Sequence, residues 1–347
     1  MSGQNRGYFK REMENYSEII IKLIDFCNMN CIMCGQISQS DNKRIIRLTY
    51  LKKYFKNKDI SEKRIYLWGG EPLLHPELKE IIEFFKQKKS FVTINTNGFQ
   101  LYDNLEYFAR QQVDRIILSL DGKDGTTHDR VRGTVGSFKI VQNCISSLRK
   151  MKKYYNLPLL RINFVVLPDN YKQILDVLDW CNAQGVHKIH FQLPIFLLNN
   201  QIASYANLLN NTYSIKVKNY TAFLNDFQGI DFRELSRIML RVYKNHCNFA
   251  RFYPFEYLRT EELKNYFFSD HIIRNCSCDV IKDKLAIDSS GHFVTCPDFP
   301  DIYYGNLSLG ITHPERLSWL KERFIAKKYL PICSRCCHFV PNQNSTL

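Results

Sequence analysis

Apolar and polar residues alternate with two different periods over the first half of the chain. Short apolar runs rich in β-branched residues are typical of buried strands, and longer stretches with apolar residues every three or four positions are typical of amphipathic helices. The predicted strands cover residues 19–26, 64–68, 91–95, 115–120, 160–167 and 187–193. The predicted helices lie near residues 47–57, 77–88, 101–112, 137–153 and 170–184. This alternation predicts an α/β fold with βαβ units around a parallel sheet, and it fits a doubly wound sheet or a partial barrel equally well.

The alternation stops at about residue 195. Mostly helical spacing follows, and then a hairpin-like pattern, LAIDSSGHFVTC, with a turn at Ser289-Ser290-Gly291. We therefore expect four parts: an N-terminal extension over residues 1–16, an α/β core over residues 17–194, a helical bridging segment over residues 195–275, and a small cysteine-rich domain over residues 276–347.

Composition excludes several classes of protein. The chain has 347 residues, 45% hydrophobic and 24% charged, as in ordinary globular proteins. It has no apolar run long enough to span a membrane, and its N-terminus lacks the apolar region of a secretory signal. We therefore expect a cytoplasmic protein with no membrane partner.

The formal net charge is +14. Such a charge suits an acidic partner, such as a nucleotide-linked substrate or an acidic peptide, or it reflects a lysine-rich, solvated surface. The lysines are scattered along the chain, which favours the second interpretation. No RNA-binding motif or appended basic domain is present, so a nucleic acid partner is not expected.

Twelve cysteines in a cytoplasmic chain indicate metal or redox chemistry rather than disulfides. Cys27, Cys31 and Cys34 have the spacing C-x3-C-x2-C and follow the first predicted strand, so they belong at the carboxyl edge of the sheet. Zinc would take four ligands, or three and a water, whereas an iron–sulfur cluster on three thiolates leaves one iron open. The spacing favours iron–sulfur over zinc.

These cysteines and three further segments resemble the radical S-adenosylmethionine (SAM) superfamily. The matching segments are the C-x3-C-x2-C motif, Trp68-Gly69-Gly70-Glu71-Pro72, Asn95-Thr96-Asn97-Gly98, and Ser119-Leu120-Asp121-Gly122 followed by His128-Asp129 and Arg132-Gly133. The last segment is similar to the S-x-D-G…H-D…R-G segment of the peptide-modifying branch. The resemblance covers roughly residues 17–193 and implies a partial (β/α)6 barrel.

The resemblance also implies the cofactors. Cys27, Cys31 and Cys34 would hold a [4Fe–4S] cluster whose open iron binds the amino and carboxylate groups of SAM. An external donor such as flavodoxin or ferredoxin would reduce the cluster, and SAM cleavage would then yield a 5′-deoxyadenosyl radical. The incomplete ligand set is thereby explained, since SAM completes it.

Roles for single residues follow from the same resemblance. The residues expected to bind SAM are Gly69, Gly70, Glu71, Pro72, Asn95, Ser119 and Arg132. The glycines would let backbone approach the methionine moiety, Glu71 would accept from its ammonium group, Ser119 would bond the ribose, and Arg132 would pair with the carboxylate. Asp121 is either a loop-capping carboxylate or a catalytic residue that faces the substrate.

The C-terminal cysteines resemble the twitch domain, a shortened relative of the SPASM domain. That resemblance implies an auxiliary [4Fe–4S] cluster on Cys278, Cys296, Cys333 and Cys336. Cys276 and Cys337 are alternates, and a structural zinc ribbon is the other interpretation. Of the remaining cysteines, Cys144 and Cys181 are predicted to be buried and inert, whereas Cys247 is a candidate hydrogen-atom donor.

We thus expect a radical SAM oxidoreductase or maturase. The leading hypothesis is modification of a ribosomally made peptide by dehydrogenation, bond formation or epimerisation. The alternative is a dehydrogenase or epimerase of a sugar or aminocyclitol, possibly nucleotide-linked, and a nucleic-acid-modifying enzyme is a third class. The first predicted strand begins near residue 17, so no peptide-recognition domain is expected before it, and a leader peptide would need another docking surface.

Overall fold

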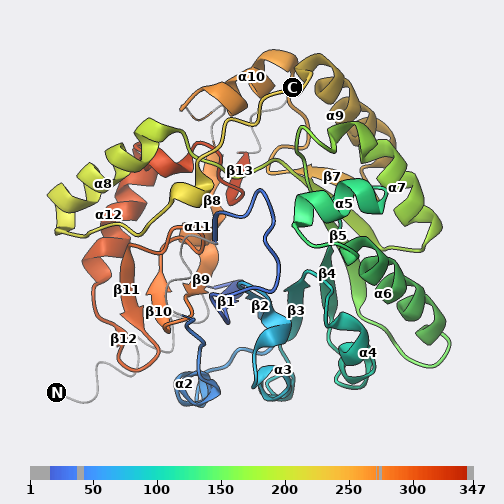
Figure 1. The fold of residues 1–347 in the computed structure, drawn as a ribbon. Helices are drawn as coiled ribbons and strands as arrows, with labels where there is room; N and C mark the ends of the chain where they lie inside the picture. The colour runs from blue at the N-terminus through green and yellow to red at the C-terminus, as the bar shows by residue number, and fades with distance from the viewer. Residues whose placement is uncertain (1–15, 37–42, 271, 273–275, 342–347) are drawn as a thin grey trace.

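The computed structural model describes residues 16–36, 43–270, 272 and 276–341 (Figure 1). Most of the predicted N-terminal extension therefore lies outside the described residues. The six predicted strands are present as β1 (Glu18–Lys22), β2 (Arg64–Trp68), β3 (Phe91–Thr96), β4 (Arg115–Ser119), β5 (Leu159–Val165) and β6 (Lys188–Gln192). They pair in chain order, every neighbour parallel. A doubly wound sheet would reverse its strand order, so this order identifies a partial barrel.

Helices cover the outer face of this sheet (Figure 1). They are α2 (Leu48–Phe55), α3 (Leu78–Gln87), α4 (Leu101–Arg110), α5 (Gly125–Arg132), α6 (Ser137–Met151) and α7 (Ile174–Ala183). Each long helix buries an apolar stripe; in α3 it includes Ile81, Ile82 and Phe85, all fully buried. The short α5, between β4 and α6, was not predicted because GTTHDRVR has few apolar positions. Single 3₁₀ turns are η2 (Pro72–Leu74), η3 (Tyr171–Gln173), η4 (Thr221–Phe223) and η5 (Pro331–Cys333).

The bridging segment is mostly helical, as its spacing predicts. It contains α8 (Asn199–Tyr213), α9 (Phe232–His246), β7 (Ala250–Tyr253) and α10 (Thr260–Phe268). The strand β7 was not predicted, because four residues are too few to show a period. It pairs parallel with β6 and adds a seventh strand to the barrel sheet.

The C-terminal part continues the same sheet on its other edge (Figure 1). Its elements are β8 (Cys276–Cys278), α11 (Asp279–Asp283), β9 (Lys284–Ile287), β10 (His292–Val294), β11 (Tyr303–Asn306), β12 (Gly310–Ile311), α12 (Pro314–Ile325) and β13 (Phe339–Pro341). The strand β9 pairs parallel with β1, and β9 to β12 are antiparallel to one another. The expected hairpin is β9–β10, and Gly291 in its turn has φ +82°, which favours glycine. The four-part division of the chain remains a prediction.

The inner and outer faces of the barrel strands differ in chemistry. Outward side chains such as Ile65, Leu67, Ile116 and Leu118 are fully buried under the helices. Inward side chains are largely polar, because alternate residues of a strand point to opposite faces. The inner face therefore presents functional groups rather than a packed core.

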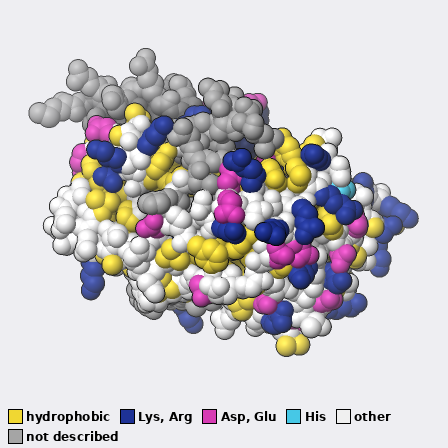
Figure 2. All heavy atoms as spheres, turned by 90° about the horizontal axis from the view of Figure 1, so that it is seen from above, with side chains coloured by type: hydrophobic (Ala, Val, Ile, Leu, Met, Phe, Trp, Pro, Cys, Tyr) yellow, Lys and Arg dark blue, Asp and Glu magenta, His cyan; other side chains and the backbone are white. Residues whose placement is uncertain are grey.

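Charged side chains of both signs are mixed on one face of the molecule (Figure 2). On the face shown in Figure 2, lysine and arginine side chains are spread among acidic and apolar ones. None of the helices in the described part of the chain is long and apolar enough to cross a membrane.

Candidate active site

A cavity of about 450 Å³ lies at the carboxyl ends of the barrel strands. Its walls include all three cysteines of the first cluster and most of the residues expected to bind SAM: Cys27, Cys31, Cys34, Gly69, Gly70, Glu71, Asn95, Ser119 and Arg132. Pro72 does not line it and instead begins η2. We call this the cysteine-loop cavity.

Gly69 and Gly70 pack the loop after β2 against the chain that leads into the cysteines. The Gly70 amide donates to Ile24 O at 2.8 Å, and the Glu71 amide donates to Phe26 O at 3.0 Å. A Cβ at Gly69 would lie 2.4 Å from Ile24 O, and one at Gly70 would lie 1.8 Å from Phe26 O. The close approach that these glycines allow is therefore to the cysteine-bearing backbone, a contact that we had not predicted.

Glu71 is buried and ties two loops together. Its Oε1 accepts from Thr96 Oγ1 at 2.7 Å and from the Leu73 amide at 3.1 Å, and its Oε2 accepts from the Asn97 amide at 2.8 Å. Burial raises the pKa of this carboxyl to about 7, although these hydrogen bonds oppose the rise. Asn97 in turn donates to Asn28 Oδ1 at 2.8 Å beside Cys27. Glu71 thus holds the strand-end loops in place around the cysteines.

Arg132 points at the cysteine loop and is held there by Asp121. Arg132 Nη2 lies 2.5 Å from Asp121 Oδ2, and Arg132 Nη1 lies 3.7 Å from Cys31 Sγ. Asp121 is fully buried, and its Oδ1 accepts from the Val165 amide at 2.6 Å. It does not line the cavity. Of its two predicted roles, the geometry favours a positioning carboxylate over a residue that faces the substrate.

The rest of the H-D…R-G segment forms local scaffolding. His128 Nδ1 accepts from the Asp121 amide at 3.0 Å, and burial lowers the pKa of His128 to about 3, so the ring stays neutral. Asp129 accepts from the Gly136 amide at 2.6 Å and the Phe138 amide at 2.8 Å at the start of α6. The last residue, Gly133, lies so close to the cysteine loop that a Cβ would be 2.2 Å from Asn30 O.

The walls of this cavity suit a thiolate-held cluster with a polar ligand. Three sulfur donors stand on one loop, with the Arg132 guanidinium beside them. Asn95 Oδ1 and Asn163 Oδ1 are buried at the cavity and have no hydrogen-bond partner among the described residues. Unpartnered buried acceptors are costly, so they indicate a ligand that donates hydrogen bonds. Asn163 was missed by the sequence reading, although its position at the end of a predicted strand was a usable signal.

A second cavity, of about 480 Å³, lies against the inner face of the strands, and we call it the barrel cavity. It shares Asn163 and Gln192 with the cysteine-loop cavity. Its walls include Arg115, Arg161 and Arg251. The sequence reading missed them, but their signal was present: basic residues recur at inward positions at or near the starts of the strands, as in RIYLW, RIILS and LLRINFV.

The second cysteine set converges on one narrow pocket. Cys278, Cys296, Cys333 and Cys336 line it together with His338. Burial raises the pKa of the Cys296 and Cys336 thiols well above their ordinary value, so a bound cation is needed to keep them as thiolates. Four thiols around one pocket match the donor set of a closed cluster site, and no three of their sulfur atoms lie within 4.8 Å of one another.

The two alternative ligands, Cys276 and Cys337, do not line this pocket. Cys276 is buried but does not line the pocket, and Cys337 faces the barrel cavity. Cys337 lies with Asp298 and His338 in a group whose ligand atoms are within 4.8 Å of one another. His338 itself lines both the four-cysteine pocket and the barrel cavity, and therefore separates them by one side chain.

The remaining cysteines lie outside these cavities. Cys144 and Cys181 are fully buried, as expected. Cys247 is exposed at the end of α9 and lines neither the cysteine-loop cavity nor the barrel cavity. This position does not favour the hydrogen-donor role.

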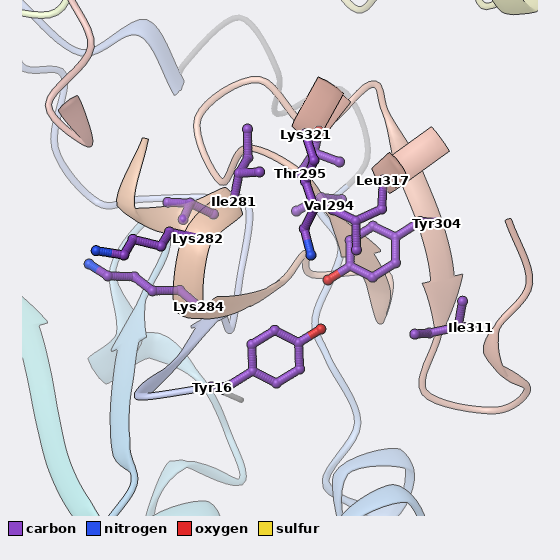
Figure 3. Close-up of a pocket in the computed structure, with 11 residues that line it drawn as sticks. Tyr16, Ile281, Lys282, Lys284, Val294, Thr295, Tyr304, Ile311, Leu317 and Lys321 are labelled. Carbon is purple, nitrogen blue, oxygen red and sulfur yellow. The ribbon is translucent and has the colours of Figure 1, made fainter. Parts of the chain in front are cut away.

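A smaller cavity of about 170 Å³ lies between the C-terminal strands and α12 (Figure 3). Its walls are Val294, Ile311, Leu317 and other apolar groups with three lysines. Lys282 and Lys284 extend in the same direction (Figure 3). No cysteine lines it, but it shares Val280, Ile281 and Thr295 with the four-cysteine pocket and therefore adjoins that site.

Comparison with known proteins identifies the core. Residues 21–181 match the Radical SAM superfamily model. The chain is 29% identical over 178 residues to a "Probable GTP 3′,8-cyclase" of Methanococcus aeolicus, covering 48% of this chain and 56% of that protein. It is 30% identical over 167 residues to an "AdoMet-dependent heme synthase" of Methanosarcina barkeri, covering 47% and 46%. The match thus spans about half the length of these curated relatives.

Solved structures share the fold. Streptococcus suis SuiB bound to the precursor peptide SuiA superposes with a TM-score of 0.59 at 16% identity, over 90% of this chain and 66% of SuiB. The protein anSMEcpe with bound AdoMet gives a TM-score of 0.59 at 18% identity, over 92% and 89%.

The superfamily binds a [4Fe–4S] cluster and SAM, and the cysteine-loop cavity has the donors for both. The four-thiol pocket fits the auxiliary cluster implied by the twitch-like C-terminus. Residues 21–181 thus match a radical SAM domain in sequence, and solved structures show the same fold over most of the chain.

Proposed function

We propose that this enzyme modifies a ribosomally made peptide by dehydrogenation, bond formation or epimerisation. The observation that carries the proposal is the position of the barrel cavity. It meets the cysteine-loop cavity at Asn163 and Gln192 and meets the four-cysteine pocket at His338. A substrate in it would lie between two redox centres.

The roles of the first site follow from its geometry. Cys27, Cys31 and Cys34 would hold the cluster, which when bound would supply reductive SAM cleavage and, through it, hydrogen abstraction. Arg132, oriented by Asp121, attracts the SAM carboxylate. Asn95 and Ser119 offer polar atoms at the ends of β3 and β4, where the ribose is expected.

The roles of the second site follow in the same way. Cys278, Cys296, Cys333 and Cys336 would hold the auxiliary cluster through four thiolates, which would leave the binding of substrate to the walls of the barrel cavity. The cluster would supply electron transfer, and His338 forms a wall shared by its pocket and the barrel cavity. Flavodoxin or ferredoxin in the cytoplasm would reduce the first cluster.

Two facts support a peptide substrate. The S-x-D-G…H-D…R-G segment is similar to that of peptide-modifying enzymes. The fold is that of SuiB, solved with its precursor peptide SuiA, and of anSMEcpe, solved with the Kp18Cys peptide. At these sequence identities, the comparison shows only that this chain has the same fold as those two proteins.

A second candidate is a dehydrogenase or epimerase of a sugar or aminocyclitol, possibly nucleotide-linked. The arginines of the barrel cavity favour it, because a phosphate-bearing substrate would match their charge. Curated relatives that are named GTP 3′,8-cyclase agree with a small anionic substrate.

The test is a turnover assay with reconstituted full-length protein, SAM and a chemical reductant under anaerobic conditions. Short peptides encoded beside the gene are offered, and mass spectrometry follows loss of hydrogen or uptake of deuterium from solvent. Modified peptide together with 5′-deoxyadenosine supports the proposal. Stimulation of 5′-deoxyadenosine formation by sugar nucleotides but by no neighbouring peptide would replace it with the second candidate.

A further inference from the structure

Four arginines line the barrel cavity: Arg64 at the start of β2 and three others on β4, β5 and β7. Arg115, Arg161 and Arg251 stand near the starts of β4, β5 and β7, at positions that point inward, and all three line the cavity. We call them the arginine cluster. Because β4, β5 and β7 belong to one curved parallel sheet, their amino ends meet at the same end of the barrel.

Among the described residues, the arginine cluster has no carboxylate partner. Arg161 Nε is buried without any hydrogen-bond partner. Arg115 lies over the Phe91 ring, 5.1 Å from its centroid, and Arg251 Nε donates to His190 Nε2 at 3.1 Å. None of the three forms a salt bridge with a described residue; Glu18 acts on Arg115 and Arg161, and Asp114 on Arg115, only from beyond salt-bridge distance.

The acidic groups of the same cavity already have partners. Glu18 and Asp279 both pair with Lys284, at 2.9 and 2.6 Å. Asp283 accepts from Ser17 Oγ at 2.7 Å. Within the cavity, the carboxylates of Glu18 and Asp279 are therefore paired with Lys284, whereas the arginines have no carboxylate in salt-bridge contact.

The arginines repel one another and their neighbour. Burial, together with the charges of Arg115 and Arg251, lowers the pKa of Arg161 to about 10. Burial and the same guanidinium groups lower the pKa of His190 to about 2, so this ring is neutral and accepts from Arg251. Like charges held together in a part-buried site cost stability, and an anionic ligand relieves that cost.

We propose that the arginine cluster binds an oxyanion of the substrate, a carboxylate or a phosphate, and so anchors it with the reacting carbon toward Asn163 and Gln192. Guanidinium forks suit both oxyanions, since each offers two oxygens in one plane. The inference rests on the proposed function and deepens it, because it requires a substrate with an acidic group at a fixed distance from the reacting carbon.

The test is isothermal titration calorimetry on the reconstituted full-length protein with SAM present, so that the cysteine-loop cavity is filled. The probes are inorganic pyrophosphate for the phosphate source and glutarate for the carboxylate source. We expect one or both to bind, and Arg161→Gln to weaken that binding about tenfold or more, the effect of one lost charge-assisted contact. Arg110→Gln is the matched control, because Arg110 is exposed and pairs with Glu106 on α4.

A second readout separates this role from a structural one. Without anion, Arg161→Gln should unfold at a temperature no lower than the wild type, because it removes a repelled charge; an arginine that held the fold together would give a clear decrease. The stabilisation that the bound probe gives to the wild type should be clearly smaller in the variant. If Arg161→Gln does not fold, Arg251→Gln at the exposed edge strand gives the same test.

Each outcome decides the inference. Pyrophosphate binding alone identifies a phosphate-bearing substrate, and glutarate binding alone identifies an acidic peptide side chain or terminus. Binding that persists unchanged in both arginine variants marks an adventitious ion only and overturns the inference. Failure of both probes to bind a preparation that still cleaves SAM overturns it as well, while leaving the peptide assay to judge the proposed function.

Discussion

The Arg132 guanidinium and the Asp121 carboxylate form a buried ion pair, with 2.5 Å between Nη2 and Oδ2, where α5 meets the cysteine loop. The pair joins two strand-end segments, because Asp121 also accepts from the Val165 amide after β5. It leaves Arg132 Nη1 free to lie beside Cys31. Asp121, which does not line the cysteine-loop cavity, thus fixes the orientation of Arg132, which does.

This pair gives the first prediction. Arg132→Ala should weaken SAM binding about tenfold or more, since a charge-assisted contact contributes roughly 1.5–3 kcal/mol, and should leave both clusters loaded. Equilibrium binding of SAM and iron content are the measurements. Arg130→Ala is the control, because Arg130 lies on the same helix but is exposed and pairs with Asp169. Unchanged SAM affinity in Arg132→Ala would make Arg132 a structural residue only.

The partner of Arg132 gives a second prediction. Asp121→Asn should lower the free energy of unfolding by about 3–5 kcal/mol, because it leaves a buried guanidinium without its counter-ion. It should weaken SAM binding as well, through the lost orientation of Arg132. Chemical denaturation measures the first effect. Normal stability with lost turnover would instead point to direct catalysis by Asp121.

Iron content tests the two cysteine sites. The reconstituted protein should hold about eight irons per chain, and replacing Cys27, Cys31 and Cys34 together should leave about four. Replacing Cys296 should remove the other four, because it is one of the four thiols of the narrow pocket. Cys247→Ala should keep all of them and retain full turnover, since that thiol is exposed outside the cavities. A preparation with zinc and no charge-transfer absorption would contradict the two-cluster interpretation.

Glycine packing around the cysteine loop gives a fourth prediction. Gly70→Ala should prevent loading of the first cluster while the second still loads, because the new Cβ would lie 1.8 Å from Phe26 O. Gly125→Ala is a fair control, since its nearest atom would be 3.7 Å away. Electron paramagnetic resonance of the reduced variants distinguishes the two clusters. Two normal signals in Gly70→Ala would show that the loop can move aside.

Glu71 gives a pH dependence with a definite sign. Burial raises its pKa to about 7 in the folded chain, against an ordinary value of 4.5. The folded state therefore holds this proton more tightly than the unfolded state, and the stability gained from the neutral carboxyl is lost as pH rises through this interval. Without SAM, the loss should be at most about 3 kcal/mol. The stability difference between wild type and Glu71→Gln, measured by denaturation from about pH 5 to pH 8, should follow this titration; a difference that is constant with pH would contradict it.

The local parts of the fold were predictable from the sequence. Strands such as RIILS and helices such as LKEIIEFFKQ show their periods within one element, because burial of one face is repeated along it. The first cysteine site is local as well, since its three thiols lie within eight residues of one loop. The residues that line its cavity were also predictable, because they belong to motifs at the ends of strands. The four residues of β7 were too few to show any period.

Convergence of distant residues was decided by the tertiary structure. Sequence order alone does not tell a barrel from a doubly wound sheet, and only the pairing of β1 through β7 in chain order brings Arg115, Arg161 and Arg251 to one end of one cavity. The same holds for Cys247, whose exposure depends on how α9 packs. The sequence determines which side chains can do chemistry and which local structure each belongs to, because those depend on near neighbours. Which of them share a cavity depends on long-range packing of the whole sheet, and only the folded chain specifies that.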